Sequence, residues 1–81
     1  MSLLTVQLFA SYAEAFGGPS LQIPLDQGST VADLVRHIRS LPAGKALPPQ
    51  PRVAVNRKFA APDQIISGSD EIAVIPPVSG G

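Results

Sequence analysis

One short segment in the middle of this 81-residue chain can form a helix with a single apolar face, and it limits the folds that are possible. Thr30 can cap the helix N-terminus, and Asp33, three residues later, can complete a capping box. Apolar residues then recur at the spacing of one helical face: Val31, Leu34, Val35 and Ile38. Because such a face must be covered, we expect it to pack on a sheet.

Two segments near the N-terminus alternate with a period of two, as half-buried strands do. Their apolar residues are Leu4, Val6 and Leu8 in the first, and Leu21, Ile23 and Leu25 in the second. Pro24 lacks an N–H group, which places the second segment at a sheet edge or strand end. We expect the two segments to pair. Between them, Ser11 is predicted to cap a short helix through Glu14, which Gly17 and the residues after it end.

The second half of the chain contains a proline-rich stretch and short strands. Residues 40–52 hold several prolines and a glycine, which favours a solvated loop. Val53 to Val55 is a short strand, and Glu71 to Ile75 is the last strand, with its residues alternating between two faces. We expect the first and last strands to lie side by side. This order predicts an α+β fold, one mixed sheet around one main helix, over residues 1–75, with a tail at 76–81.

The composition excludes several classes of function. The chain has six acidic and six basic side chains and no long run of either sign, so we expect no nucleic-acid or anionic-membrane surface. Cysteine is absent, which excludes a thiol nucleophile, a disulfide and a thiolate metal site. We find no apolar run of membrane-spanning length and no signal-peptide pattern, so we expect a cytoplasmic protein.

No set of side chains in the sequence has the pattern of a catalytic centre. The one histidine, His37, faces away from the apolar stripe and is interpreted as a solvated surface residue, because no second ligand stands at helical spacing. Gly17-Gly18 and Gly28 lack the spacing of a phosphate-binding loop. We therefore expect no metal, no bound cofactor and no nucleotide site of the chain's own.

The chain ends in Pro76-Pro77-Val78-Ser79-Gly80-Gly81. Prolines fix φ and donate no N–H, so they stiffen the exit from the last strand. Glycines have no side chain, so they can pass through a narrow channel and present the terminal carboxylate to a reacting atom. A terminus can also end in glycine without any function. The tail therefore indicates either a reactive end on a stiff stalk or an ordinary chain end.

Two apolar residues near this tail are candidates for partner contacts. Ile75 stands where the last strand gives way to the tail, and Phe59 could lie beside it. Such residues resemble the apolar anchors of protein interfaces. The periodicity equally allows both to be ordinary core residues.

Four segments together resemble a known family, the small subunit of molybdopterin synthase (MoaD). They are Leu8-Phe9-Ala10 with its short helix, Gly28 to Leu34, Val53-Ala54-Val55-Asn56, and Asp70 to Gly81. The similarity extends over nearly the whole chain. The terminal Pro-Pro-Val-Ser-Gly-Gly is the specific part, whereas the helix start is shared by many ubiquitin-like β-grasp proteins. Ala13 stands where members often have arginine, and Ser69 where they often have glycine.

This resemblance implies a ubiquitin-like β-grasp fold and a sulfur-carrier role in molybdenum cofactor synthesis. In the family, a ubiquitin-activating-type enzyme (MoeB-like) uses ATP to adenylate the terminal glycine, here Gly81, and a sulfurtransferase step makes it a thiocarboxylate. The large subunit (MoaE-like) holds the catalytic residues and converts cyclic pyranopterin monophosphate to molybdopterin. Phe59 and Ile75 match the family's apolar subunit contacts by position. The residues implied to thread into the large subunit are Pro76, Pro77, Val78, Ser79 and Gly80.

Three other interpretations stay open at this point. A carrier of another pathway, such as a ThiS-like thiamine carrier, shares the fold and the diglycine. A ubiquitin-like protein modifier would end in an isopeptide bond from Gly81 to a lysine. In a plain interaction module the tail would be incidental, and its removal would leave function intact.

Overall fold

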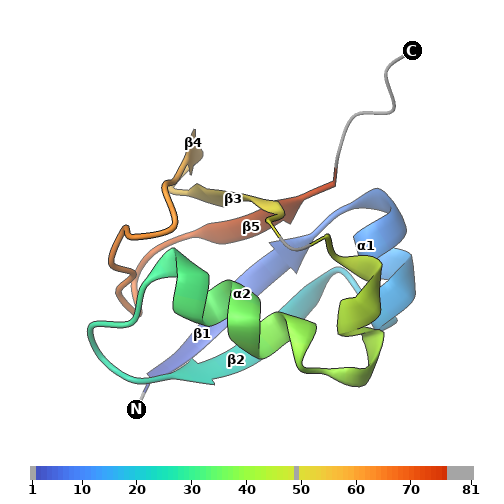
Figure 1. Cartoon of the computed structure of the whole chain (residues 1–81), viewed down its shortest axis with the longest axis horizontal. Helices are drawn as coiled ribbons and strands as arrows, with labels where there is room; N and C mark the ends of the chain where they lie inside the picture. The colour runs from blue at the N-terminus through green and yellow to red at the C-terminus, as the bar shows by residue number, and fades with distance from the viewer. Residues whose placement is uncertain (1, 49, 77–81) are drawn as a thin grey trace.

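The computed structural model describes residues 2–48 and 50–76 (Figure 1). Its elements, in chain order, are β1 (Ser2–Leu8), α1 (Ala10–Phe16), β2 (Ser20–Leu25), α2 (Val31–Arg39), the 3₁₀ helix η1 (Pro42–Ala46), β3 (Arg52–Val55), β4 (Lys58–Phe59) and β5 (Ile72–Ile75). Within these two ranges, no helix has both the length and the apolar character that crossing a membrane requires.

The strands form one mixed five-stranded sheet in the order β2-β1-β5-β3-β4. β1 pairs in parallel with β5, so the predicted neighbourhood of the first and last strands is confirmed. β1 also pairs antiparallel with β2, again as predicted, and β3 pairs antiparallel with both β4 and β5. β2 lies at an edge, where the missing N–H of Pro24 breaks no ladder bond. β5, which leads into the C-terminal tail, lies at the centre.

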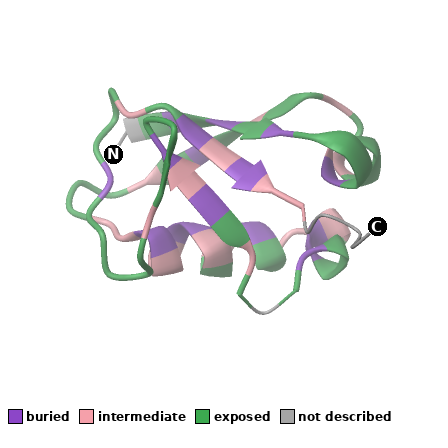
Figure 2. Cartoon of the chain, turned by 90° about the horizontal axis from the view of Figure 1, so that it is seen from above, coloured by how far each residue is buried: buried purple, intermediate pink, exposed green. Residues whose placement is uncertain are grey.

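α2 covers one face of the sheet and closes the core (Figure 1). Its predicted stripe is buried at Val31, Leu34 and Ile38, while Val35 is only half-buried. The strands meet it with alternate residues, and Figure 2 shows buried positions alternating with more exposed ones along the central strands. The strand residues buried against it include Leu4, Val6, Leu8, Ile23, Val53, Val55, Ile72 and Val74. The predicted α+β architecture is confirmed.

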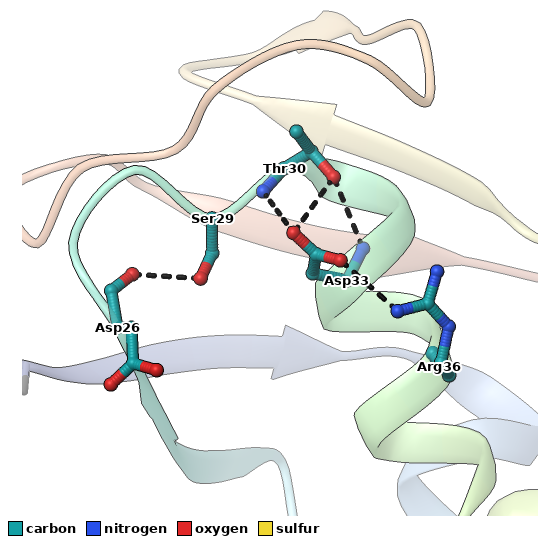
Figure 3. A network of polar contacts seen from close by, with 5 residues as sticks. All are labelled: Asp26, Ser29, Thr30, Asp33 and Arg36. Atoms are coloured by element: carbon teal, nitrogen blue, oxygen red, sulfur yellow. Dashed lines mark hydrogen bonds and ion pairs between the residues drawn. The ribbon is translucent and has the colours of Figure 1, made fainter.

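The start of α2 is fixed by the predicted capping box (Figure 3). The Thr30 hydroxyl accepts a hydrogen bond from the backbone N–H of Asp33 at 3.2 Å, and the Asp33 carboxylate accepts one from the Thr30 N–H at 2.9 Å. The Thr30 N–H and hydroxyl both donate to the Asp33 carboxylate and lower the pKa of Asp33, as does the nearby Arg36 guanidinium, because all of them favour the ionised carboxylate. The negative charge also suits the positive end of the helix dipole.

The predicted cap of the first helix is wrong. Ser11 lies inside α1, whose N-cap residue is Phe9, and no side chain caps that end. The helix is positioned instead by Tyr12, whose ring is buried in the core. Packing of one aromatic ring thus outweighs the local preference of serine for a cap. Gly17 ends the helix as expected, with φ of 79° in the left-handed region that glycine adopts readily.

The segment expected to be a solvated loop, residues 40–52, contains η1. Pro42 begins this 3₁₀ helix, where its missing N–H costs nothing. Gly44 is buried at its centre, and a Cβ there would clash with the backbone of Ile38 and Arg39. Leu47, directly after η1, is buried in the core. The segment therefore packs against the end of α2 through Gly44 and Leu47.

Candidate functional site

Alternate residues of the strands face away from α2 and form the outer face of the sheet. The pairing register places Gln7 of β1 beside Ala73 of β5, Ala73 beside Ala54 of β3, and Ala54 beside Phe59 of β4. This row crosses four strands, and its two central members are alanines. Because alanine is short, the middle of the row is hollow while its sides are raised. A shallow groove results, which we call the outer groove.

Apolar side chains surround this hollow. Phe9, Phe59 and Ile75 line the outer groove together with the row of residues described above. Phe59 is 66% exposed, and Phe9 is 45% exposed. The two residues predicted as partner contacts, Phe59 and Ile75, therefore lie in one concave surface rather than in the core. Large apolar groups around a hollow on an exposed face indicate a protein-binding surface.

Charged residues lie at one end of the groove and over one side. Arg57 and Glu71 line the end where β5 begins, with Arg57 Nε 3.5 Å from Glu71 Oε2. The Arg52 guanidinium lies over the Phe59 ring, 5.4 Å from its centroid. Such a cation–π contact at an exposed site is worth about 0.5–1 kcal/mol. It favours this position of Phe59, which the core does not bury.

The end of the groove at Arg57 is set by a tight turn between β3 and β4. Asn56 and Arg57 have φ of 54° and 71°, the left-handed pair of a type I′ hairpin. The Asn56 side chain donates to Asp70 Oδ1 at 3.0 Å and accepts from the Glu71 N–H at 2.9 Å. These two bonds tie the hairpin to the loop before β5. The Ser67 N–H and the Asn56 amide both donate to Asp70 and lower the pKa of its carboxyl.

The tail leaves the sheet at the other end of the outer groove. β5 ends at Ile75, which pairs with Arg52, and Pro76 follows half-buried. Phe9 comes directly after β1, whose Leu8 is in register with Val74, so it lies at the same end. Pro76, the last described residue, therefore lies at the Phe9 and Ile75 end of the outer groove. The remaining predicted tail residues, Pro77, Val78, Ser79, Gly80 and Gly81, lie outside the described residues.

The structure changes the interpretation of the single histidine. His37 is half-buried on α2, not fully solvated as predicted. In residues 2–48 and 50–76, no three histidine or carboxylate side chains gather in a way that could hold a metal ion.

Sequence reasoning missed most of the outer groove. The lining residues that were not predicted include Gln7, Phe9, Ala54, Arg57 and Ala73. The alternation of side chains along each strand could have indicated some of them, because residues that alternate with core positions must face outwards. The register between strands far apart in sequence was not visible, so the meeting of Ala54, Ala73 and Phe59 could not be foreseen.

Comparison with known proteins supplies the family. The model of the ThiS family matches residues 6–81. The chain belongs to the ThiS family. This ThiS-family chain is 38% identical over 81 residues to a protein named molybdopterin synthase sulfur carrier subunit from Dictyostelium discoideum, an alignment that covers 94% of the chain and 93% of that protein. The resemblance predicted from the four sequence segments is thereby confirmed.

Solved structures support the fold of this ThiS-family member. Small archaeal modifier protein 1 of H. volcanii superposes with a TM-score of 0.82 at 26% identity, and the superposition covers 96% of this chain and 100% of that one. A chain from the complex of subunits 1 and 2 of the molybdopterin-converting factor from Helicobacter pylori 26695 superposes with a TM-score of 0.70 at 18% identity. The superposition covers 98% of this chain and 99% of that one. The predicted β-grasp fold is confirmed.

Proposed function

We propose that this chain is the sulfur-carrier subunit of a molybdopterin synthase, with the C-terminal carboxylate of Gly81 as the group that carries sulfur. The observation that carries the proposal is its similarity to the Dictyostelium sulfur carrier subunit over nearly the full length of both chains. The sequence supplies a terminal diglycine for the chemistry. The structure supplies an apolar groove beside the strand that leads to it.

The reaction begins with activation of the terminal carboxylate, because a carboxylate is a poor electrophile. An adenylating enzyme (MoeB-like) joins Gly81 to the AMP part of ATP and releases pyrophosphate. A sulfurtransferase then provides sulfur at the oxidation level of sulfide, which attacks the acyl carbon and displaces AMP. The product is a thiocarboxylate, which is a better nucleophile than the carboxylate at neutral pH. ATP is consumed by the activating enzyme, and the carrier needs no metal or bound cofactor.

Sulfur is then delivered in the large subunit (MoaE-like), which supplies the catalytic residues. The thiocarboxylate sulfur attacks cyclic pyranopterin monophosphate, and water releases the carrier as its carboxylate. A dithiolene contains two sulfur atoms and each carrier brings one, so each product consumes two charged carriers. A narrow diglycine end suits this role, since it can enter an active site without displacing the residues around it.

The outer groove is the proposed docking surface for the large subunit. Phe59 and Ile75 are its apolar anchors, and the tail leaves the sheet directly beyond Ile75. Docking at this groove would therefore bring the tail towards the partner at the same time. The structurally similar chain from Helicobacter pylori was solved in a complex of subunits 1 and 2 of the molybdopterin-converting factor, which supports an assembly of a small and a large subunit.

A second candidate function is favoured by a different similarity. The structural likeness to small archaeal modifier protein 1 supports a protein modifier whose Gly81 is joined to a lysine. A carrier for thiamine synthesis is a third, since the family model itself is named ThiS. Mass spectrometry of Gly81 from cells separates the first two: replacement of oxygen by sulfur indicates a carrier, and a branched lysine peptide indicates a modifier.

Deletion of Gly81 tests the carrier role directly. Synthase reconstituted with the shortened chain should form no molybdopterin, because the carboxylate that receives sulfur has moved by one residue. The thermal midpoint should be unchanged, since the described core ends before the tail. Unaltered molybdopterin production by the shortened chain would contradict the proposal. The ThiS-like alternative would be favoured if this chain restored thiamine production, but not molybdopterin production, in a strain deleted for its own carriers.

A further inference from the structure

A second groove lies on the helix side of the sheet, between α2 and the segment after β4. We call it the helix-side groove. Its apolar lining includes Val31 and Val35 of α2, with Ala60 and Pro62 opposite. Its remaining side is formed partly by Arg36 and Arg39, in the last turn of α2. The proposed sulfur chemistry does not use this groove.

The apolar stripe of α2 extends from the core to the edge of the helix-side groove. Val31, Leu34 and Ile38 are buried, but Val35, which belongs to the same stripe, remains half-buried at the groove. Ala60 on the opposite side is also half-buried. Both residues pack against the core with part of their surface, and the rest is left as apolar surface in the groove that a partner's apolar side chain could cover.

The charge of the groove is positive. Its lining contains two arginines and no carboxylate. Arg36 Nη1 lies 3.1 Å from Asp33 Oδ1, so part of its charge is already compensated (Figure 3). Arg39, by contrast, is exposed and has no carboxylate within ion-pair distance among residues 2–48 and 50–76. An apolar floor with a free arginine at its rim is complementary to an acidic peptide segment that also carries apolar side chains.

The helix-side groove is continuous with the outer groove around the β4 edge of the sheet. A shallow depression at that edge is lined by Arg52, Phe59, Ala60 and Pro62, among others. It shares Ala60 and Pro62 with the helix-side groove and Phe59 with the outer groove. Arg52 adds a further arginine along the same path. A partner seated on Phe59 would therefore find a basic, apolar track that leads from the outer face to α2.

We propose that the helix-side groove binds an acidic, extended segment of the large subunit that wraps from the outer groove around the β4 edge. The inference rests on the proposed function for the identity of the partner. It adds a second contact surface to that partner and states the chemistry of the segment. Arg39 is its principal charged contact and Val35 its apolar one.

Charge reversal at Arg39 tests this contact, with Lys45→Glu as the matched control. Lys45 is an exposed cation in η1 that lines neither groove. Isothermal titration with the purified large subunit of the same organism should give a dissociation constant about tenfold higher for Arg39→Glu, and a smaller rise for Arg39→Gln, as expected for loss of a close charge pair. Lys45→Glu should change it less than about twofold. Thermal melting of each variant checks that α2 is intact.

A crosslinker at the apolar contact tests the chemistry of the segment. With a photoreactive benzoylphenylalanine in place of Val35, irradiation of the complex should join it to a peptide of the large subunit that contains Asp or Glu beside apolar residues. A crosslink to a basic segment, or no crosslink in a complex that forms normally, would overturn the proposal. So would an unchanged dissociation constant for Arg39→Glu.

The variant Ile75→Asp separates this inference from the proposed function. If Ile75→Asp weakens binding and Arg39→Glu does not, the helix-side contact is wrong while docking at the outer groove stands. If Arg39→Glu alone weakens binding, the helix-side contact stands and the outer groove is not the docking surface. If neither variant changes the dissociation constant, both contacts are wrong.

Discussion

The inner and outer faces of the sheet are built from alternate residues of the same strands, yet their exposure is opposite. On the inner face, Val6, Ile72 and Val74 are 0% exposed beneath α2. On the outer face, Leu3 and Phe59 are 64% and 66% exposed. Burial of the inner set stabilises the fold, whereas the fold gains little from an apolar side chain left in water. The difference shows which residues hold the chain together and which are free to bind a partner.

Two neighbouring residues of β5 give the largest test of this difference. Val74 faces the core, so Val74→Asp would place an unpaired charge in it and cost several kcal/mol, about the whole stability of a small domain. We expect the variant to lose its far-ultraviolet circular dichroism signal at room temperature. A cooperative melt at the wild-type temperature would show that the inner face is not the stabilising one.

The adjacent substitution, Ile75→Asp, should affect binding and leave the fold intact. Ile75 lies half-buried at the outer groove, where a carboxylate keeps access to water in the free chain but loses it under a partner. The dissociation constant for the large subunit should rise by more than about tenfold, the loss expected for an interface anchor. Calorimetric titration measures the binding, and thermal melting should show a change of only a few degrees. Binding equal to wild type would remove Ile75 from the interface.

A smaller test lies inside the core, at its one unsatisfied polar atom among the described residues. The Tyr12 hydroxyl is buried and has no hydrogen-bond partner there, and burial raises its pKa. Removing it with Tyr12→Phe takes away a desolvated group without leaving another unpaired, so unfolding free energy should rise by about 1 kcal/mol. Urea unfolding measures this. A loss of stability would indicate that the hydroxyl has a bonding partner in solution.

The smallest expected effect concerns Asp70, in the loop before β5. Its pKa in the folded chain is lowered from the ordinary value of 3.8, first by the Ser67 N–H and then by the Asn56 amide. The carboxylate therefore stabilises the fold above that value, and this contribution is lost as the pH falls through the lowered pKa. We expect the thermal midpoint to fall less steeply below about pH 4 in Asp70→Asn than in wild type. The effect should stay below about 1 kcal/mol because the site is largely solvated.

Asp63→Asn provides the control for that titration. Asp63 is exposed and its carboxylate makes no hydrogen bond or ion pair among the described residues. Asp63→Asn therefore removes one carboxylate without breaking a hydrogen bond, so a difference between the two variants reports on the network around Asp70. If both variants show the same slope, the Asp70 network contributes nothing measurable to stability.

Much of the fold followed from local patterns. The Thr30–Asp33 box and the stripe after it predicted α2 correctly, because capping and helical spacing depend on residues only a few positions apart. Pro24 placed β2 at an edge for a similarly local reason. The Ser11 cap failed since burial of Tyr12 positions α1, and that burial depends on partners elsewhere in the chain.

The candidate site was predicted only in part. Phe59 and Ile75 were singled out, but the sequence could not decide between core and surface for them. Their meeting with Phe9 requires the parallel pairing of β1 with β5 and the hairpin that brings Phe59 beside Ala54. These contacts join residues far apart in sequence, and no local pattern encodes their register.

By itself the sequence determined the terminal diglycine and the local elements. The diglycine terminus, the lack of cysteine and the capping box are properties of the covalent chain and of near neighbours. Only the tertiary structure decided that β5 is the central strand, that two alanines leave a hollow on the outer face, and that Arg39 stays unpaired in the described part of the chain beside Val35. The physical reason is that surfaces form between strands and helices whose relative placement depends on the packing of the whole core.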